Sequence, residues 1–187
     1  MPNLFLENLF KQDEDKNLYS YALIDSARII KLTNELTLLN QEQYEILFEG
    51  EDAFQLEEVA PYLVELKKED EFTTWVAKNV YDRYGAIFIK SINDIETLAQ
   101  HLKEFIHVNR EVEFEGEVVT QKGYLAYYDP RVFPVWIESE SQERQAKFFS
   151  NIEELLCEDE FKEHHYLSYH YNNELTIQTE KAYKESV

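Results

Sequence analysis

The hydrophobic residues of the first hundred positions alternate between short continuous runs and helical stripes. Predominantly apolar runs, typical of strands that are buried on both faces, occupy residues 18–24, 44–48, 62–66 and 86–89. Apolar residues at helical spacing predict helices at 27–38, 71–83 and 94–107, with a short amphipathic helix at 3–11 and a helical turn at 53–59. Strands that alternate with helices predict an α/β (mixed α+β) fold, in which a mixed, partly parallel β-sheet is flanked by helices.

Residues with special backbone preferences set the limits of several of these elements. Asp25 and Ser26 are good N-cap residues for the helix predicted at 27–38. Pro61 lacks a backbone N–H, so it can only begin the strand that follows it. Gly85 is a plausible stop for the helix predicted at 71–83.

The next part of the chain predicts a β-hairpin that leads into a sharp corner. Residues 112–120 alternate apolar and charged positions, 121–123 contain a glycine turn, and 124–128 are rich in aromatic residues. The run Asp129-Pro130-Arg131 ends the second strand, because a proline gives no donor to a sheet. We interpret this corner as structural, with a local ion pair; an active-site corner or a partner contact is the alternative.

The last third of the chain differs in character from the rest. It predicts a helix at 138–145, an acidic segment at 151–160, and two strands at 164–171 and 174–179 that are joined by an Asn-Asn turn. We therefore expect two parts: a domain at 1–140 and a C-terminal extension or small lobe at 141–187 that packs on it.

Charge narrows the classes of partner. The 187 residues include 18 Lys plus Arg and 38 Asp plus Glu, for a net charge of −20. This excess disfavours nucleic acid, whose binding depends on Lys and Arg that neutralise phosphates, and it disfavours anionic membranes. It favours solubility and fits either a basic protein partner or simple self-solvation, and charge alone does not choose between these. The first ten residues make a poor signal peptide, no run approaches about 20 apolar residues, and Cys157 is the only cysteine, so we expect a cytoplasmic protein.

The sequence contains few motifs for catalysis, phosphate binding or metal binding. Only four glycines occur, and their spacing excludes a P-loop and a dinucleotide fingerprint. Cys157 lies among acidic residues, which disfavour the thiolate that a nucleophile needs. His164 and His170 would stand roughly 20 Å apart on a strand, too far for one zinc ion. His101 borders a helical apolar stripe, where a hydrogen-bonded structural role is favoured over a binding role. We predict no catalytic residue, cofactor or metal.

Several runs, taken in order, resemble the bacterial type VI secretion effector-adaptor domain, a family long catalogued as a domain of unknown function. The resemblance spans roughly residues 18–140. It is carried by five runs: Tyr21-Ala22-Leu23-Ile24-Asp25-Ser26-Ala27-Arg28, Leu47-Phe48-Glu49-Gly50, Val59-Ala60-Pro61-Tyr62-Leu63-Val64-Glu65-Leu66, His101-Leu102-Lys103, and Tyr127-Tyr128-Asp129-Pro130-Arg131-Val132.

The resemblance implies an adaptor chaperone of the bacterial cytoplasm rather than an enzyme. Such proteins hold a toxic effector and help to load it onto the spike-tip protein VgrG. The residues that carry over as family-motif positions, structural or partner-binding, are Asp25, Arg28, Glu49, Pro61, His101, Asp129, Pro130 and Arg131. The chain departs from the family at Glu104, where a second basic residue is frequent, and at 123–126, which contain no basic residue.

Two other functions stay open at this point. An acidic interaction module, such as a DNA mimic or an inhibitor of a basic enzyme, would also explain the charge. A hydrolase with an unrecognised site would require His101 or Asp129 to converge with other polar groups in a pocket.

Overall fold

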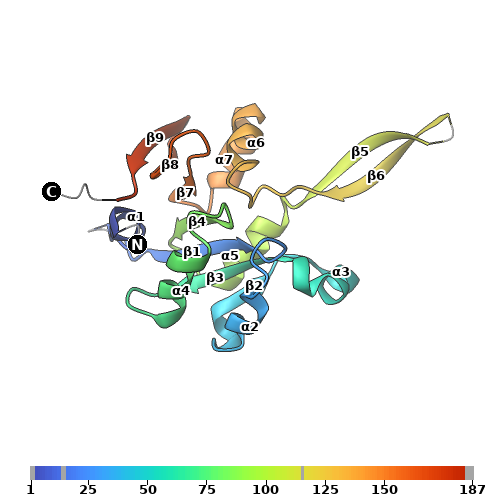
Figure 1. Ribbon diagram of the computed structural model, residues 1–187. Coiled ribbons are helices and arrows are strands. Elements are labelled where there is room, and N and C mark those ends of the chain that lie inside the picture. Colours follow the sequence, from blue (N-terminus) through green and yellow to red (C-terminus); the bar gives the residue numbers. More distant parts are fainter. Residues whose placement is uncertain (1–2, 14–15, 115, 184–187) are drawn as a thin grey trace.

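The computed structural model describes residues 3–13, 16–114 and 116–183 and contains two β-sheets with helices around the larger one (Figure 1). The strands are β1 (Tyr19–Asp25), β2 (Tyr44–Ile46), β3 (Pro61–Leu66), β4 (Ala86–Ser91), β5 (His107–Phe114), β6 (Glu117–Tyr124), β7 (Glu154–Glu158), β8 (His165–Tyr171) and β9 (Leu175–Lys181). The helices are α1 (Asn3–Leu9), α2 (Leu32–Leu36), α3 (Gly50–Gln55), α4 (Glu71–Asn79), α5 (Ile95–Lys103), α6 (Phe133–Ser139) and α7 (Gln142–Phe149), with 3-10 turns η1 (Gln41–Gln43) and η2 (Glu57–Val59). None of the helices in the described residues is long and apolar enough to cross a membrane.

The larger sheet has seven strands in the order β2-β3-β1-β4-β7-β8-β9. The prediction of a mixed α and β fold with a C-terminal hairpin is confirmed. The prediction of partly parallel pairing is wrong: among the described strands every pairing is antiparallel. Strands β1 and β4 are buried along nearly their whole length, because helices supply core residues around the sheet, and this burial gave the apolar runs that are also typical of parallel strands.

Three predicted helices are shorter than their apolar stripes. The helix predicted at 27–38 is only α2, because residues 26–31 form turns in which the Asp25 carbonyl accepts from the N–H groups of Arg28 and Ile29. Helix α4 ends at Asn79, ahead of two left-handed residues, Asp82 and Tyr84. Helix α5 ends at Lys103. Apolar residues therefore continue to face the core after the helical hydrogen bonding has ended.

The predicted hairpin exists, but its turn is elsewhere. β5 and β6 turn at Gly116, whose φ of +84° suits glycine, and the run predicted as one strand at 112–120 crosses this turn. The turn predicted at 121–123 lies inside β6, where Gln121 pairs with Arg110. The aromatic run that was predicted as a strand at 124–128 is mostly turn, although Tyr127 is completely buried.

The acidic segment at 151–160 contains a strand, β7, that the sequence analysis did not predict. β7 is buried throughout, including Glu154 and Glu158. Glu154 pairs with Lys90 on β4 at 3.0 Å, and Glu158 accepts a hydrogen bond from the backbone N–H of Tyr84 at 2.9 Å. The predicted terminal hairpin is confirmed as β8–β9, which turns at left-handed Asn173 and continues the same sheet. The domain division at residue 140 stays a prediction.

An aromatic cluster joins the helices that follow the corner to the rest of the core. The Phe148 ring on α7 lies 5.1 Å from the rings of Phe105 and Trp136 and 5.7 Å from Tyr127. These contacts are edge-on, the geometry that aromatic quadrupoles favour. Phe148 thus connects the segment just after α5 with α6, α7 and the buried turn at Tyr127.

Phe148→Ala is expected to lower the free energy of unfolding by about 3–5 kcal/mol, because it opens a cavity at the centre of this cluster. Urea unfolding followed by fluorescence measures the change. Val135→Ala, on an α6 side chain that is 74% exposed, is the control and should stay within about 0.5 kcal/mol of the parent. A loss below about 1 kcal/mol for Phe148→Ala would contradict the central position of this ring.

Candidate functional site

The Asp129-Pro130-Arg131 run forms a compact ion pair at the end of a buried turn. The Arg131 guanidinium binds the Asp129 carboxylate with two hydrogen bonds, from Nε to Oδ1 at 3.0 Å and from Nη2 to Oδ2 at 2.5 Å. The backbone N–H of Arg131 also donates to Oδ1, at 2.9 Å. Asp129 and Pro130 are buried, while the Arg131 side chain is 39% exposed. The predicted local ion pair is therefore present, with bidentate geometry.

One further motif residue, Arg28, meets this ion pair from just after β1, and Asp25 lies at the end of that strand. Arg28 Nη1 lies 3.7 Å from Asp129 Oδ2, and its Nη2 donates to the carbonyl of Arg83 at 3.3 Å. Asp25 Oδ1 accepts from the N–H of Ala27, and the backbone of Asp25 faces Pro61 in the β1–β3 register. We call the group Asp25, Arg28, Pro61, Asp129, Pro130 and Arg131 the motif corner.

The pKa values of the two acids of the motif corner are shifted in opposite directions. Burial alone would raise the pKa of Asp129, but the hydrogen bonds and charge of Arg131, with the charge of Arg28, hold that pKa below its usual value. Burial raises the pKa of Asp25 above its usual value, against the hydrogen bond from Ala27 and the charge of Arg28. Burial, reinforced by the charge of Asp82, raises the pKa of nearby Glu158 to about 8.

The remaining predicted site residues lie elsewhere and contact different partners. His101 on α5 is buried, and its Nε2 lies 2.7 Å from the carbonyl oxygen of Phe148. This bond links α5 to α7, as expected for a structural histidine. Glu49 is exposed just before α3 and makes no side-chain cap to that helix. His101 and Asp129 therefore do not share hydrogen-bond partners, and the convergence that a hydrolase would need is not seen at these two residues.

Cys157 is buried in the sheet, and His170 of the histidine run lies in a hydrogen-bond network. Cys157 is fully buried on β7, and burial raises the pKa of its thiol well above the ordinary value. His170 Nε2 lies 3.0 Å from Ser168 Oγ, which donates to Glu154 Oε1 at 2.7 Å. Within the described residues, no group of three or more His, Cys, Asp or Glu is placed to hold a metal ion.

Sequence reasoning missed the polar network around the Lys90–Glu154 pair. The two residues are far apart in the chain and lie on neighbouring strands, so neither has a local signal of its partner. Glu154 also accepts from Asn8 of α1 at 3.1 Å, and Lys90 donates to the Asn8 carbonyl at 3.2 Å. The network lines an open cavity of about 950 Å³ between α1 and strands β8 and β9.

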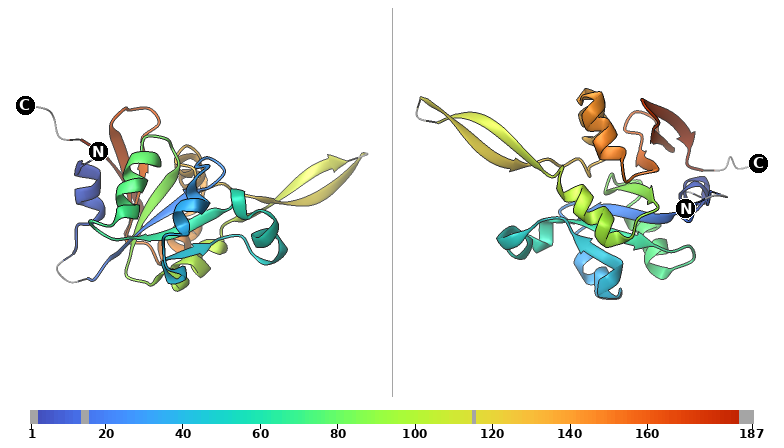
Figure 2. Two further views of the ribbon diagram at one scale, coloured as in Figure 1. Left: turned by 60° about the horizontal axis from the view of Figure 1, so that its bottom comes forward. Right: turned by 180° about the vertical axis from the view of Figure 1, so that it is seen from behind.

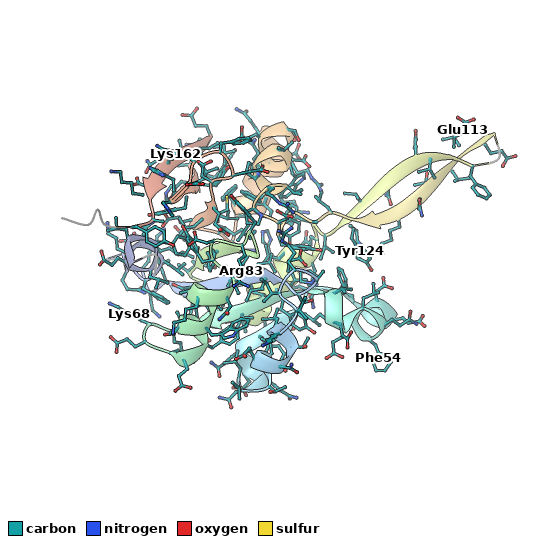
Figure 3. The ribbon with its side chains drawn as sticks, in the orientation of Figure 1. Phe54, Lys68, Arg83, Glu113, Tyr124 and Lys162 are labelled. Atoms are coloured by element: carbon teal, nitrogen blue, oxygen red, sulfur yellow. The ribbon has the colours of Figure 1, made fainter. Side chains whose placement is uncertain are left out.

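Sequence reasoning predicted a hairpin in this part of the chain, but it misplaced the turn and did not predict the projection of the β5–β6 hairpin, which we call the arm. It extends away from the body of the protein in all three views (Figures 1 and 2). Figure 3 places Tyr124 at its base and Glu113 near its tip. Strands of eight residues at about 3.3 Å per residue give the arm a length of roughly 25 Å.

The base of the arm is fixed to the body by aromatic and backbone contacts. The Tyr124 ring stacks on Phe48 with centroids 4.3 Å apart, and its hydroxyl donates to Asp52 of α3. The N–H of Leu125 donates to the carbonyl of Ile106 at 2.8 Å. Three residues after the arm ends, the buried Tyr127 donates from its hydroxyl to the Leu102 carbonyl at 2.8 Å. The arm thus runs directly into the turn that carries the motif corner.

Arg131→Ala is expected to lower the free energy of unfolding by about 1–3 kcal/mol, because it removes two charge-assisted bonds to a buried carboxylate. Partial exposure of Arg131 keeps the loss below that of a fully buried pair. Arg83→Ala, at an exposed arginine, is the matched control and should change stability by less than about 0.5 kcal/mol. Equal effects of the two variants in thermal or urea unfolding would contradict a bracing role for Arg131.

Glu158→Gln is expected to flatten the dependence of stability on pH. Because the folded pKa of Glu158 is about 8 and the ordinary value is 4.5, its contribution is complete below about pH 4.5 and is lost as the pH rises to about 8. The variant should therefore gain melting temperature over the parent progressively from about pH 5 to pH 8. Exposed Glu160→Gln is the control. Melting curves of Glu158→Gln that stay parallel to the parent at every pH would refute this behaviour.

Comparison with known proteins gives one match. The family model of DUF4123, a domain of unknown function, matches residues 20–147, which includes β1 to α6 and most of α7. No curated protein and no solved structure matches the chain. The matched region contains the motif corner, His101 and the whole arm. Because the match covers more than half of its length, the chain belongs to the DUF4123 family, a domain of unknown function.

Proposed function

We propose that the protein is a type VI secretion adaptor, which binds a toxic effector in the bacterial cytoplasm and helps to load it onto the VgrG spike tip. The observation that carries the proposal is the arm, a long two-stranded ribbon with uncovered apolar side chains on a rigid base. The five sequence runs that resemble effector-adaptor domains support it, and all of them lie within or overlap the region that matches DUF4123.

The internal contacts of the motif residues support a binding role for the arm, because they hold its base in place. Asp129 is held by Arg131 and Arg28, and His101 is bonded to the α7 backbone. These contacts fix the turn from which the arm extends. An adaptor needs such an arrangement, since a partner that binds to an exposed element gains affinity when that element is held in a fixed direction.

We propose that this role involves no chemistry by the chain itself. The Cys157 sulfur is buried in the sheet, and the guanidinium of Arg131 is occupied by an internal carboxylate. The binding function then depends on shape, apolar contact and charge.

An acidic module that mimics DNA or inhibits a basic enzyme is the second candidate, and the net charge of −20 favours it. The two functions differ in a simple competition. A DNA mimic displaces DNA from a basic protein in a salt-sensitive manner, whereas an adaptor forms a complex with an effector or a spike protein.

In a secreting strain, affinity-tagged protein is expected to recover an effector, a VgrG-type spike protein, or both. Deletion of the gene should abolish secretion of that effector while the effector is still synthesised, because unloaded cargo does not leave the cell. Secretion assays and mass spectrometry of the purified complex measure these outcomes. Recovery of neither protein, with normal secretion in the deletion strain, would refute the adaptor function.

A further inference from the structure

We infer that one face of the arm is the docking surface for a basic protein partner, an inference that rests on the proposed adaptor function and specifies its partner-binding site. The apolar residues of this face are Val108, Val112, Phe114 and Val119, and we call it the apolar face. The inference follows from the register of the arm, from the exposure of its side chains, and from the charge around it.

The register divides the arm into two unlike faces. Side chains alternate along a strand, and directly paired residues lie on the same side of a ribbon. Val112 pairs with Val119 and Val108 pairs with Gly123, so these residues share a face with Phe114. The pairs Arg110–Gln121 and Phe114–Glu117 belong to the same face by register, so it is not purely apolar. The opposite face carries the pairs Asn109–Lys122, Glu111–Thr120 and Glu113–Val118. Four apolar residues therefore share one face, whereas in these three pairs of the other face the one apolar side chain is Val118, which is 71% exposed.

The apolar face is not covered by the described part of the chain. Phe114 is 63% exposed and Val119 is 39% exposed, although both are large apolar side chains. β5 and β6 form a sheet of two strands, with no third described strand beside them. An isolated two-stranded hairpin is only marginally stable in water, so a partner that covers this face would also stabilise the arm.

The charge around the arm selects the partner. The exposed acids on the described part of the arm, Glu111, Glu113 and Glu117, outnumber its two basic residues, Arg110 and Lys122. At its base, Tyr124 contacts Asp52, and the segment 49–58 around α3 contains five acidic residues and no basic residue. A positively charged surface complements this end of the molecule, which speeds association and makes it dependent on salt. A second copy of the chain is disfavoured, because each copy carries a net charge of −20.

Apolar contact and charge make different contributions to binding at this surface. Contact with Phe114 and Val119 supplies most of the affinity, as buried apolar anchors do in protein interfaces. The surrounding acids supply orientation and rate of association. The occupant is therefore a protein segment that combines apolar side chains with lysine or arginine.

Site-specific photo-crosslinking tests the surface in living cells of a secreting strain. The probe is p-benzoyl-phenylalanine in place of Phe114, with the same replacement at Phe161 as the remote control. Phe161 is 94% exposed in the β7–β8 connection, next to Lys162, which Figure 3 shows far from the arm tip. We expect an adduct at 114 only, with a protein whose crosslinked segment is rich in lysine or arginine, identified by mass spectrometry.

The partner that the crosslink identifies is then purified on its own and titrated against the full-length chain, which tests the apolar face itself. Phe114→Asp and Val119→Asp should each raise Kd by about 10-fold or more, because they place a charge in the apolar contact. Val118→Asp is the matched control: it adds the same charge one position away on the opposite face, and it should change Kd less than about 3-fold. Raising the salt from about 0.05 to about 0.5 M should weaken binding of the parent chain.

Each outcome decides the inference separately from the adaptor function. Adducts at 114 with a second copy, equal adducts at 161, no adduct at 114, or equal losses from Val118→Asp and Val119→Asp would overturn the apolar face as the docking surface. An effector or spike protein recovered by affinity purification would still support the adaptor function in those cases. A basic partner that is neither effector nor spike would support the docking surface and count against the adaptor function.

Discussion

The buried carboxylate of Asp129 is the constraint on which the geometry of this protein most depends. A carboxylate taken out of water is costly unless it is paired and hydrogen-bonded, and here Arg131 satisfies it from its own turn while Arg28 approaches from the end of β1. The three residues must therefore keep their relative positions. Since Arg28 also bonds to the carbonyl of Arg83, the turn before β4 is held with them.

This constraint matters because the chain enters the corner directly from the arm. Between Tyr124 and Asp129 the backbone passes through Tyr127, whose ring and hydroxyl are both fixed inside the core. The arm is therefore anchored to the core at its base, whereas its apolar face is not covered by the described part of the chain. In the proposed function, the rigid base presents the exposed apolar face to another protein, so motif residues with charged side chains need not touch a partner themselves.

The sequence allowed three central strands, β1, β3 and β4, to be predicted, since they are apolar runs with clear ends, but it did not reveal their antiparallel pairing. It allowed the pairing of Asp129 with Arg131 to be predicted, because the two residues are neighbours. β7 could not be predicted, because its glutamates are neutralised or bonded by Lys90 and Tyr84, which are distant in sequence. The turn of the arm was misplaced because the alternation of apolar and charged residues at Val112, Phe114 and Val118 continues across Gly116.

The most direct test of the account is hydrogen–deuterium exchange of the full-length protein, alone and with its effector and spike protein. The account predicts fast exchange along β5 and β6 in the free protein, slow exchange at residues 127–133 in both states, and new protection of the arm on binding. Exchange in the arm that is unchanged by binding, together with new protection at the motif corner or on another surface, would contradict it.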